Sequence, residues 1–128
     1  MANAIGAFPF IAGGAITKFA VVELSGTARE VTETNAANDA ALGVVEEEVT
    51  AADATNERVV NVVTEGIVTC IASEAIVAHV RVRATSDGKV ADLAAAAKQN
   101  VFGWALTDAV ADGDHIKVLI DKQQIDNS

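Results

Sequence analysis

The chain has 128 residues, about the size of one domain, and 51% of them are hydrophobic. Its formal net charge of -9 argues against binding to nucleic-acid phosphates, which requires clustered Lys and Arg. Cys70 is the only cysteine, so an internal disulfide is excluded, and no Cys/His cluster has the spacing of a metal site. We therefore expect a buried, unreactive thiol and neither metal, cofactor nor nucleic acid as a partner.

The chain begins with an apolar segment that we expect to be extended. Residues 1–12 lack the basic start of a signal peptide, and their apolar run is too short to cross a membrane. Pro9, the only proline, disfavours helix at the preceding residue. Two exposed Phe would be costly in a monomer. We predict an N-terminal arm over residues 1–12 that attaches to the body or to a neighbouring subunit through Phe8, Pro9, Phe10 and Ile11.

Beyond the arm, valine-rich runs separated by glycine turns predict β-strands. The chain contains 18 Val, and the run Val80-Arg81-Val82-Arg83 alternates as a half-buried strand does. Ser25-Gly26, Asp87-Gly88 and Asp112-Gly113 are turn signals. Alanine-rich stretches near 34–39, 51–56 and 91–99 predict loops or single helical turns, and 122–128 predicts a polar tail. The strands are expected at about 15–24, 29–34, 41–49, 57–64, 66–72, 76–84, 88–92, 101–107 and 115–121.

Residues 19–45 and 79–106 follow one pattern twice. Each copy has a strand-like run, a Gly turn, a polar-then-Val step, an alanine-rich stretch and an apolar-Gly-apolar motif. Gly43 and Gly103 in these motifs are 60 positions apart, and we expect both to allow a close backbone approach. The strands that follow, starting at Arg58 and His115, are 57 apart. This repeat predicts an all-β fold, a small β-barrel or β-sandwich of two related strand–turn–strand units in a single domain over 13–121.

The sequence shows no catalytic pattern. His79 and His115 each open a predicted strand, and no nucleophile or phosphate-loop motif accompanies them. Glu46-Glu47-Glu48 is interpreted as a solvated strand edge, with a divalent-cation site as the alternative. Arg81 and Arg83 share one face of a strand, which is either solvated or in contact with an acidic neighbour. We therefore predict a protein that is not an enzyme.

The order of these motifs resembles the small capsid cement or head decoration proteins of tailed bacteriophages. The matching elements, spread over residues 13–121, are Ala41-Leu42-Gly43-Val44-Val45, Gly66-Ile67-Val68, Phe102-Gly103-Trp104-Ala105 and Asp112-Gly113-Asp114. The resemblance implies a virion structural protein, made in the host cytoplasm, that binds the outer surface of an icosahedral head. It implies a homo-oligomer, with a trimer favoured over a dimer, that binds the major capsid protein and stabilises the capsid by joining neighbouring subunits.

Two other classes of function stay open at this point. A carbohydrate- or cell-surface-binding β module would use Trp104, the only Trp, although a chain without Tyr has few sugar-stacking rings. A small hydrolase would use His79 or His115 with a carboxylate. Under the virion hypothesis the residues expected to contact the capsid or a sister subunit are Phe8, Pro9, Phe10, Ile11, Arg81, Arg83 and Trp104.

Overall fold

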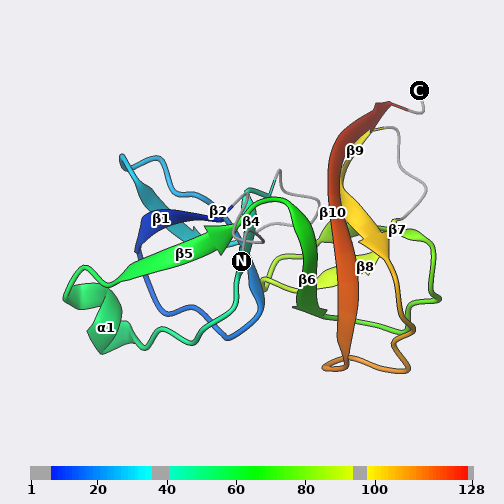
Figure 1. Cartoon of the computed structure of the whole chain (residues 1–128), viewed down its shortest axis with the longest axis horizontal. Coiled ribbons are helices and arrows are strands. Elements are labelled where there is room, and N and C mark those ends of the chain that lie inside the picture. Colours follow the sequence, from blue (N-terminus) through cyan, green and yellow to red (C-terminus); the bar gives the residue numbers. More distant parts are fainter. Residues whose placement is uncertain (1–6, 36–40, 94–97, 127–128) are drawn as a thin grey trace.

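The computed structural model describes residues 7–35, 41–93 and 98–126, and it confirms the all-β prediction (Figure 1). Two β units lie next to each other along the longest axis. None of the helices in the described part of the chain is long and apolar enough to cross a membrane. The elements in order are β1 (Ala7–Ala12), β2 (Ala20–Leu24), β3 (Glu30–Glu33), β4 (Gly43–Val45), α1 (Ala51–Thr55), β5 (Val59–Val63), β6 (Gly66–Ile71), β7 (Arg81–Ala84), β8 (Val90–Asp92), β9 (Lys98–Ala105) and β10 (His115–Asp126).

The first unit, residues 7–63, is a closed five-stranded barrel in the order β1-β3-β2-β4-β5. β1 pairs antiparallel with β5 and parallel with β3, so its backbone groups have partners on both sides. The prediction of an arm over residues 1–12 is therefore corrected. Residues 7–12 are extended, as expected, but they form a strand of the barrel, and residues 1–6 lie outside the described part of the chain.

The second unit, residues 66–126, repeats the strand order of the first. Its five strands are arranged as β6-β10-β9-β7-β8, so that β6, β10, β9, β7 and β8 correspond to β1, β5, β4, β2 and β3. A parallel bridge between Ala72 and Val90 joins its outer strands, as the pair Ala12 and Val31 does in the first unit. The predicted duplication is therefore a duplication of a complete five-stranded unit, and it includes β1 and β6, which the sequence comparison left out.

The match between the units holds residue by residue. Phe19 and His79, 60 positions apart, both have the positive φ that is rare for residues other than Gly (70° and 74°). In the last strand Val59 pairs with Ile11 and His115 pairs with Ile71, so the offset there is 56 and not the predicted 57. The first unit has the extra residues because it contains α1, where the second unit has a tighter turn at Gly113.

The helical turn and the chain end also differ in part from expectation. Thr50 caps α1 through a capping box with Asp53, which agrees with a single helical turn near 51–56. Residues 36–39 and 94–97 of the other two stretches lie outside the described part of the chain. In the stretch 91–99, Ala91 and Asp92 belong to β8 and Lys98 and Gln99 begin β9, so its described ends are strand and not loop. β10 continues to Asp126 by pairing with the start of β9, so most of the predicted tail at 122–128 is strand. A shift in register between Ile120 and Gln123 allows this continuation.

The glycines of the two repeat motifs have the role expected for them. A Cβ on Gly43 would overlap the carbonyl oxygen of Val63, and a Cβ on Gly103 would overlap that of Leu119. Each glycine thus lets β4 approach β5, or β9 approach β10, at the same place in its unit.

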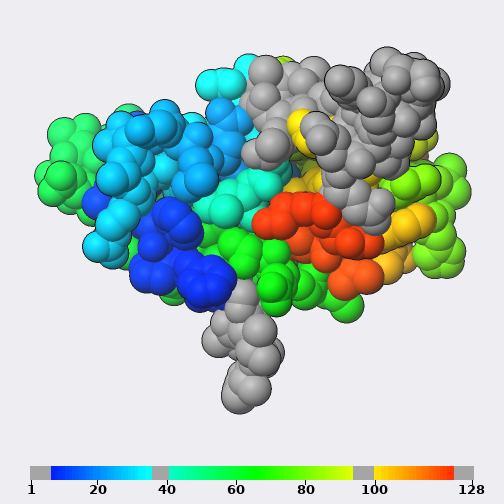
Figure 2. Space-filling view, turned by 90° about the horizontal axis from the view of Figure 1, so that it is seen from above, coloured from blue at the N-terminus to red at the C-terminus, as the bar shows by residue number. Residues whose placement is uncertain are grey.

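Two clusters of buried side chains form the core. The first unit encloses one cluster around Ile16, Val22 and Val31. The second cluster, around Phe102 and Ile116, also contains Val21 and Val44 of the first unit. In Figure 2 the cyan-green atoms of the first unit lie directly against the orange atoms of the second. The two units are therefore joined by a shared core.

Candidate interaction surfaces

The two units contact each other through apolar side chains and two hydrogen bonds. Val21 and Val44 point out of the first unit and are fully buried in the core of the second. The Val21 N–H donates to the carbonyl oxygen of Gly88, 2.8 Å away, in the turn between β7 and β8. The buried Thr34 hydroxyl donates to the Thr85 carbonyl oxygen in the same turn, at 2.7 Å. One side of the first unit is thus covered by one end of the second.

Two further contacts cross this junction. The ring of Phe19 lies edge-on to the imidazole of His115, with ring centres 5.2 Å apart. The Lys122 ammonium donates to the Leu42 carbonyl oxygen at 2.8 Å. Partial burial lowers the pKa of Lys122, although the charge of Glu65 acts in the opposite direction. His115, one of the two candidate catalytic histidines, therefore contacts an aromatic ring at the junction.

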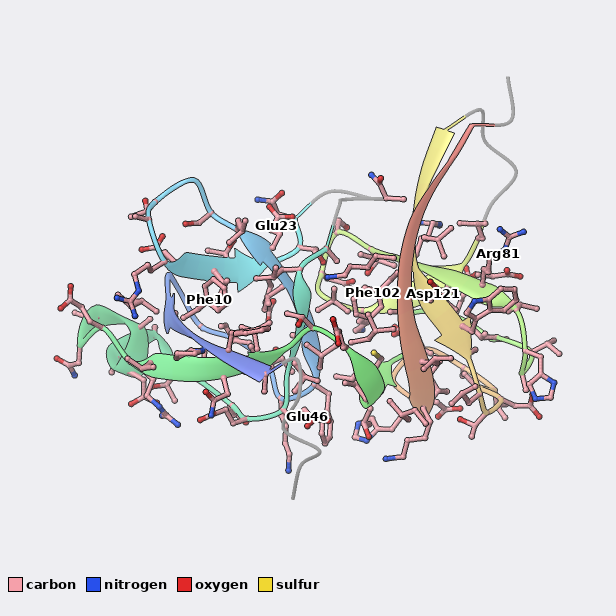
Figure 3. All side chains as sticks on the ribbon, turned by 45° about the horizontal axis from the view of Figure 1, so that its top comes forward. Phe10, Glu23, Glu46, Arg81, Phe102 and Asp121 are labelled. Atoms are coloured by element: carbon pink, nitrogen blue, oxygen red, sulfur yellow. The ribbon has the colours of Figure 1, made fainter. Side chains whose placement is uncertain are left out.

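The predicted contact residues of the N-terminal segment divide into two kinds. Phe8 is 51% exposed and Pro9 is exposed, at the start of β1. Phe10 is half-buried and packs on the core of the first unit, inside the barrel in Figure 3. Ile11 is half-buried and lines a pocket. Of these four residues, Phe8 and Pro9 are the exposed ones.

The other predicted contact residues gather on the outer face of the second unit. The Arg81 guanidinium lies over the ring of Trp104, 5.5 Å from its centre. The Trp104 indole N–H donates to the carboxylate of Asp121 at 3.1 Å. In Figure 3 Arg81 is labelled on the side of the second unit away from the first. Arg83 follows on the same strand, and its Nε is buried without an acceptor among the described residues.

Sequence reasoning missed two apolar members of this face. Leu119 pairs with both Ile67 and Trp104, and Trp104 pairs with Arg81. Ile67 is 62% exposed and Leu119 is 39% exposed. Leu119 could have been found from the sequence. It stands between Val118 and Ile120, which both pack in the core, so alternation places it on the outer face, where a polar residue would be expected. We call this line across four strands, formed by Ile67, Leu119, Trp104 and Arg81, the second-unit row.

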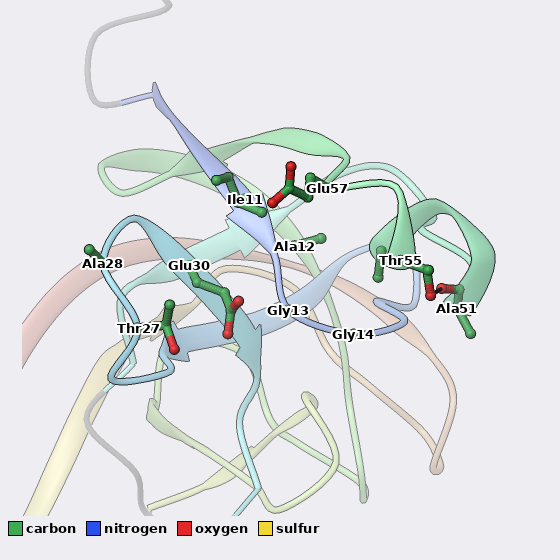
Figure 4. Close-up of a pocket in the computed structure, with 11 residues that line it drawn as sticks. Ile11, Ala12, Gly13, Gly14, Thr27, Ala28, Glu30, Ala51, Thr55 and Glu57 are labelled. Atoms are coloured by element: carbon green, nitrogen blue, oxygen red, sulfur yellow. Dashed lines mark hydrogen bonds between the residues drawn. The ribbon is translucent and has the colours of Figure 1, made fainter.

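A pocket of about 550 Å³ opens at one end of the first unit (Figure 4). It lies between the end of β1, the turn before β3 and α1, and small side chains form much of its lining. Glu30 and Glu57 supply its carboxylates, and the Ser25 hydroxyl donates to Glu30 at 2.8 Å. Within the described ranges, no group of three or more His, Cys, Asp or Glu side chains could hold a metal ion.

The remaining candidate chemical groups have structural surroundings. Cys70 is buried, as predicted, and burial raises the pKa of its thiol well above the ordinary value. Glu47 forms an ion pair with Arg58, which also pairs with Asp53 at 3.3 Å. His79 is exposed, and its backbone N–H donates to the Ala105 carbonyl oxygen at 2.6 Å. His79 thus lies in the turn before β7 and is held there by a backbone hydrogen bond.

The two-unit all-β fold is shared with a solved phage protein. The chain is similar to the crystal structure of the head fiber gp8.5 N base in bacteriophage phi29, with a TM-score of 0.69 and 18% sequence identity. The similarity covers 90% of this chain and 92% of the phage chain. No protein-family model matches the sequence, and no curated protein matches it. The likeness to the head fiber base therefore concerns the fold.

Proposed function

We propose that this chain is a structural protein of a bacteriophage virion, made in the host cytoplasm and located on the outer surface of the capsid. The observation that carries the proposal is the fold likeness to a phage head fiber base over 90% of the chain. The glycine motifs that resemble head decoration proteins support it independently. The shared core of the two units supports it as well, because a protein that braces a shell needs a stiff body.

In this proposal the protein binds the major capsid protein and holds neighbouring capsid subunits together. Phe8 and Pro9 are exposed at the start of β1, where an apolar contact with the capsid or with a sister subunit is available. The net charge of -9 keeps the free protein soluble and favours a basic docking patch. The protein acts as a homo-oligomer, preferably a trimer, without enzymatic activity, cofactor, nucleic acid or membrane.

The surroundings of Trp104 argue against the carbohydrate-binding alternative. A sugar-binding ring needs an open face on which the sugar can stack. The Arg81 guanidinium already lies over the Trp104 ring, and the indole N–H is bonded to Asp121. Trp104 therefore fits a protein contact better than a sugar platform.

The proposal is tested by adding the purified chain to phage heads that lack it. We expect saturable co-sedimentation with expanded heads, a rise in their thermal stability, and weaker binding at high salt. Heads of an unrelated phage are the control for nonspecific adsorption. Failure to bind heads of the cognate phage at any salt concentration would contradict the proposal.

A further inference from the structure

The duplication allows the exposed surfaces of one unit to be compared with the buried surfaces of the other. In the first unit, the residues that match the second-unit row are Ala7, Val63, Val44 and Val21, which pair across strands in the same order. Val44 and Val21 are fully buried against the second unit, and Val63 packs on the same cluster. In the second unit the matching row faces solvent, with Ile67 and Leu119 exposed.

The end of the second unit that covers Val21 and Val44 also has a matching end in the first unit. The second unit covers the first-unit row with an end that includes Val68, Ala84 and the turn at Gly88, and the two side chains lie in the shared cluster. The matching positions in the first unit are Phe8, Leu24 and the turn 25–29. We call these residues the first-unit rim. Phe8 is 51% exposed, Leu24 is 59% exposed, and the turn residues are exposed.

The contact inside the molecule uses the row of the first unit and the matching end of the second unit. The second-unit row and the first-unit rim are therefore left without a partner surface of this kind in the described part of the chain. Within the described residues, no rim covers the second-unit row and no row covers the first-unit rim. These two uncovered surfaces account for five of the exposed large apolar residues, which are Phe8, Leu24, Val59, Ile67 and Leu119. Val59 belongs to this set because it matches His115, which lies at the junction. Since His79 matches Phe19, the edge-on pair of Phe19 and His115 would have His79 and Val59 as its counterpart between molecules.

The chemistry of the second-unit row suits a contact between separate molecules. Trp104 and Arg81 replace Val44 and Val21, and these two residue types are enriched at the energetic centres of interfaces. The buried Nε of Arg83 beside the row is a donor whose acceptor is not among the described residues. A row that combines apolar and cationic groups can also attract another copy of an acidic chain.

We infer that the second-unit row binds a second copy of this chain, through the first-unit rim of that copy. The inference rests on the homo-oligomer of the proposed function and names the two faces that form it. The contact is head-to-tail, because the row and the rim are different surfaces. Such contacts produce a closed ring when the rotation between copies closes, and an open chain when it does not.

The test measures molecular mass in solution by sedimentation equilibrium over a range of concentrations. We expect the wild-type chain to form assemblies larger than the 13.1 kDa monomer. Leu119→Lys in the row and Leu24→Lys in the rim should each weaken association at least tenfold. Val110→Lys is the matched control, because Val110 is 83% exposed and belongs to neither face. Circular dichroism confirms that each variant is folded.

Mixing the two defective variants tests the head-to-tail arrangement directly. The Leu119→Lys chain keeps an intact rim and the Leu24→Lys chain keeps an intact row, so an equimolar mixture should form a dimer with one intact contact. A mixture that stays monomeric, a wild-type chain that is monomeric at every concentration, or a Val110→Lys chain that dissociates equally would each overturn the inference. Self-association without binding to heads would instead contradict the proposed function and leave this inference intact.

Discussion

The Val21 N–H and the Gly88 carbonyl oxygen, 2.8 Å apart, join the side of the first unit to the turn that ends β7. Gly88 has φ of 77°, and a Cβ there would lie 3.2 Å from the Cβ of Ala20. The junction therefore depends on a residue without a side chain at a position with left-handed backbone. Substitutions at this turn should weaken the contact between the two units.

Gly88→Ala should lower the free energy of unfolding by more than Gly26→Ala does. Both positions have positive φ, which costs an L-residue roughly 1–2 kcal/mol. A Cβ on Gly26 meets nothing within 4 Å, whereas one on Gly88 would lie 3.2 Å from the Cβ of Ala20, which is closer than an ordinary contact. Urea unfolding of the two variants measures the difference, which reports the packing at the junction. Equal losses would mean that the turn does not contribute to that packing.

Gly43→Ala and Gly103→Ala should each be strongly destabilising. In both variants the new methyl group would overlap a carbonyl oxygen of the neighbouring strand, so the strands must separate. We expect a loss of about 3 kcal/mol or more, or failure to fold. Gly14→Ala is the control, because its Cβ would meet nothing within 4 Å and its φ is not positive. A wild-type-like melting temperature for Gly103→Ala would contradict the expected close approach.

Cys70 should make stability depend on alkaline pH. Burial, and secondarily the charge of Glu46, holds the pKa of its thiol above the value in the unfolded chain. The protonated thiol is then favoured in the folded state, so its stabilising contribution is complete below about pH 8.5 and is lost as pH rises above that value. Relative to Cys70→Ala, wild-type stability should fall by up to about 1.4 kcal/mol per pH unit between pH 8.5 and 10.5.

The same thiol provides a second measurement. Under native conditions a thiol reagent should label Cys70 only as fast as the protein opens, because the side chain is buried. Labelling should become complete in denaturant. Rapid labelling of the native protein at neutral pH would contradict the burial of this residue.

Removing residues 1–12 should unfold the first unit. The deletion removes β1, whose partners β3 and β5 would both be left with unpaired edges. Phe8→Ser, which alters an exposed side chain and leaves the strand in place, should keep the fold. Thermal unfolding followed by circular dichroism compares the two variants. A truncated chain that melts like wild type would show that β1 is dispensable for the barrel.

The sequence predicted much of the fold because valine alternation and glycine turns are local signals. The predicted strands contain β2 to β8 and overlap β9 and β10, and Gly26, Gly88 and Gly113 lie with positive φ in the turns that were predicted. The assignment of residues 7–12 to an arm failed for a different reason. Pairing of β1 with β5 joins Ala7 to Val63, and no local pattern specifies a partner so distant in the sequence.

The candidate surface was predictable in part for the same reason. Arg81 and Arg83 were visible as charged residues on one strand face, and Trp104 was visible as a single large aromatic residue. Their meeting with Leu119 and Ile67 depends on the order β6-β10-β9-β7 across the sheet. Strand order is a property of the whole chain. Only the structure therefore separated Phe10, which packs inside, from Phe8, which reaches the surface.

The burial of Val21 and Val44 in the core of the second unit has a consequence for how the chain unfolds. The second half completes its apolar interior only with side chains of the first, and the first half alone would expose Val21 and Val44 to water. Heating should therefore melt both halves in one transition, with equal calorimetric and van't Hoff enthalpies. A chain opened by cleavage at Thr64-Glu65, between β5 and β6, should yield two fragments that regain structure only when they are combined.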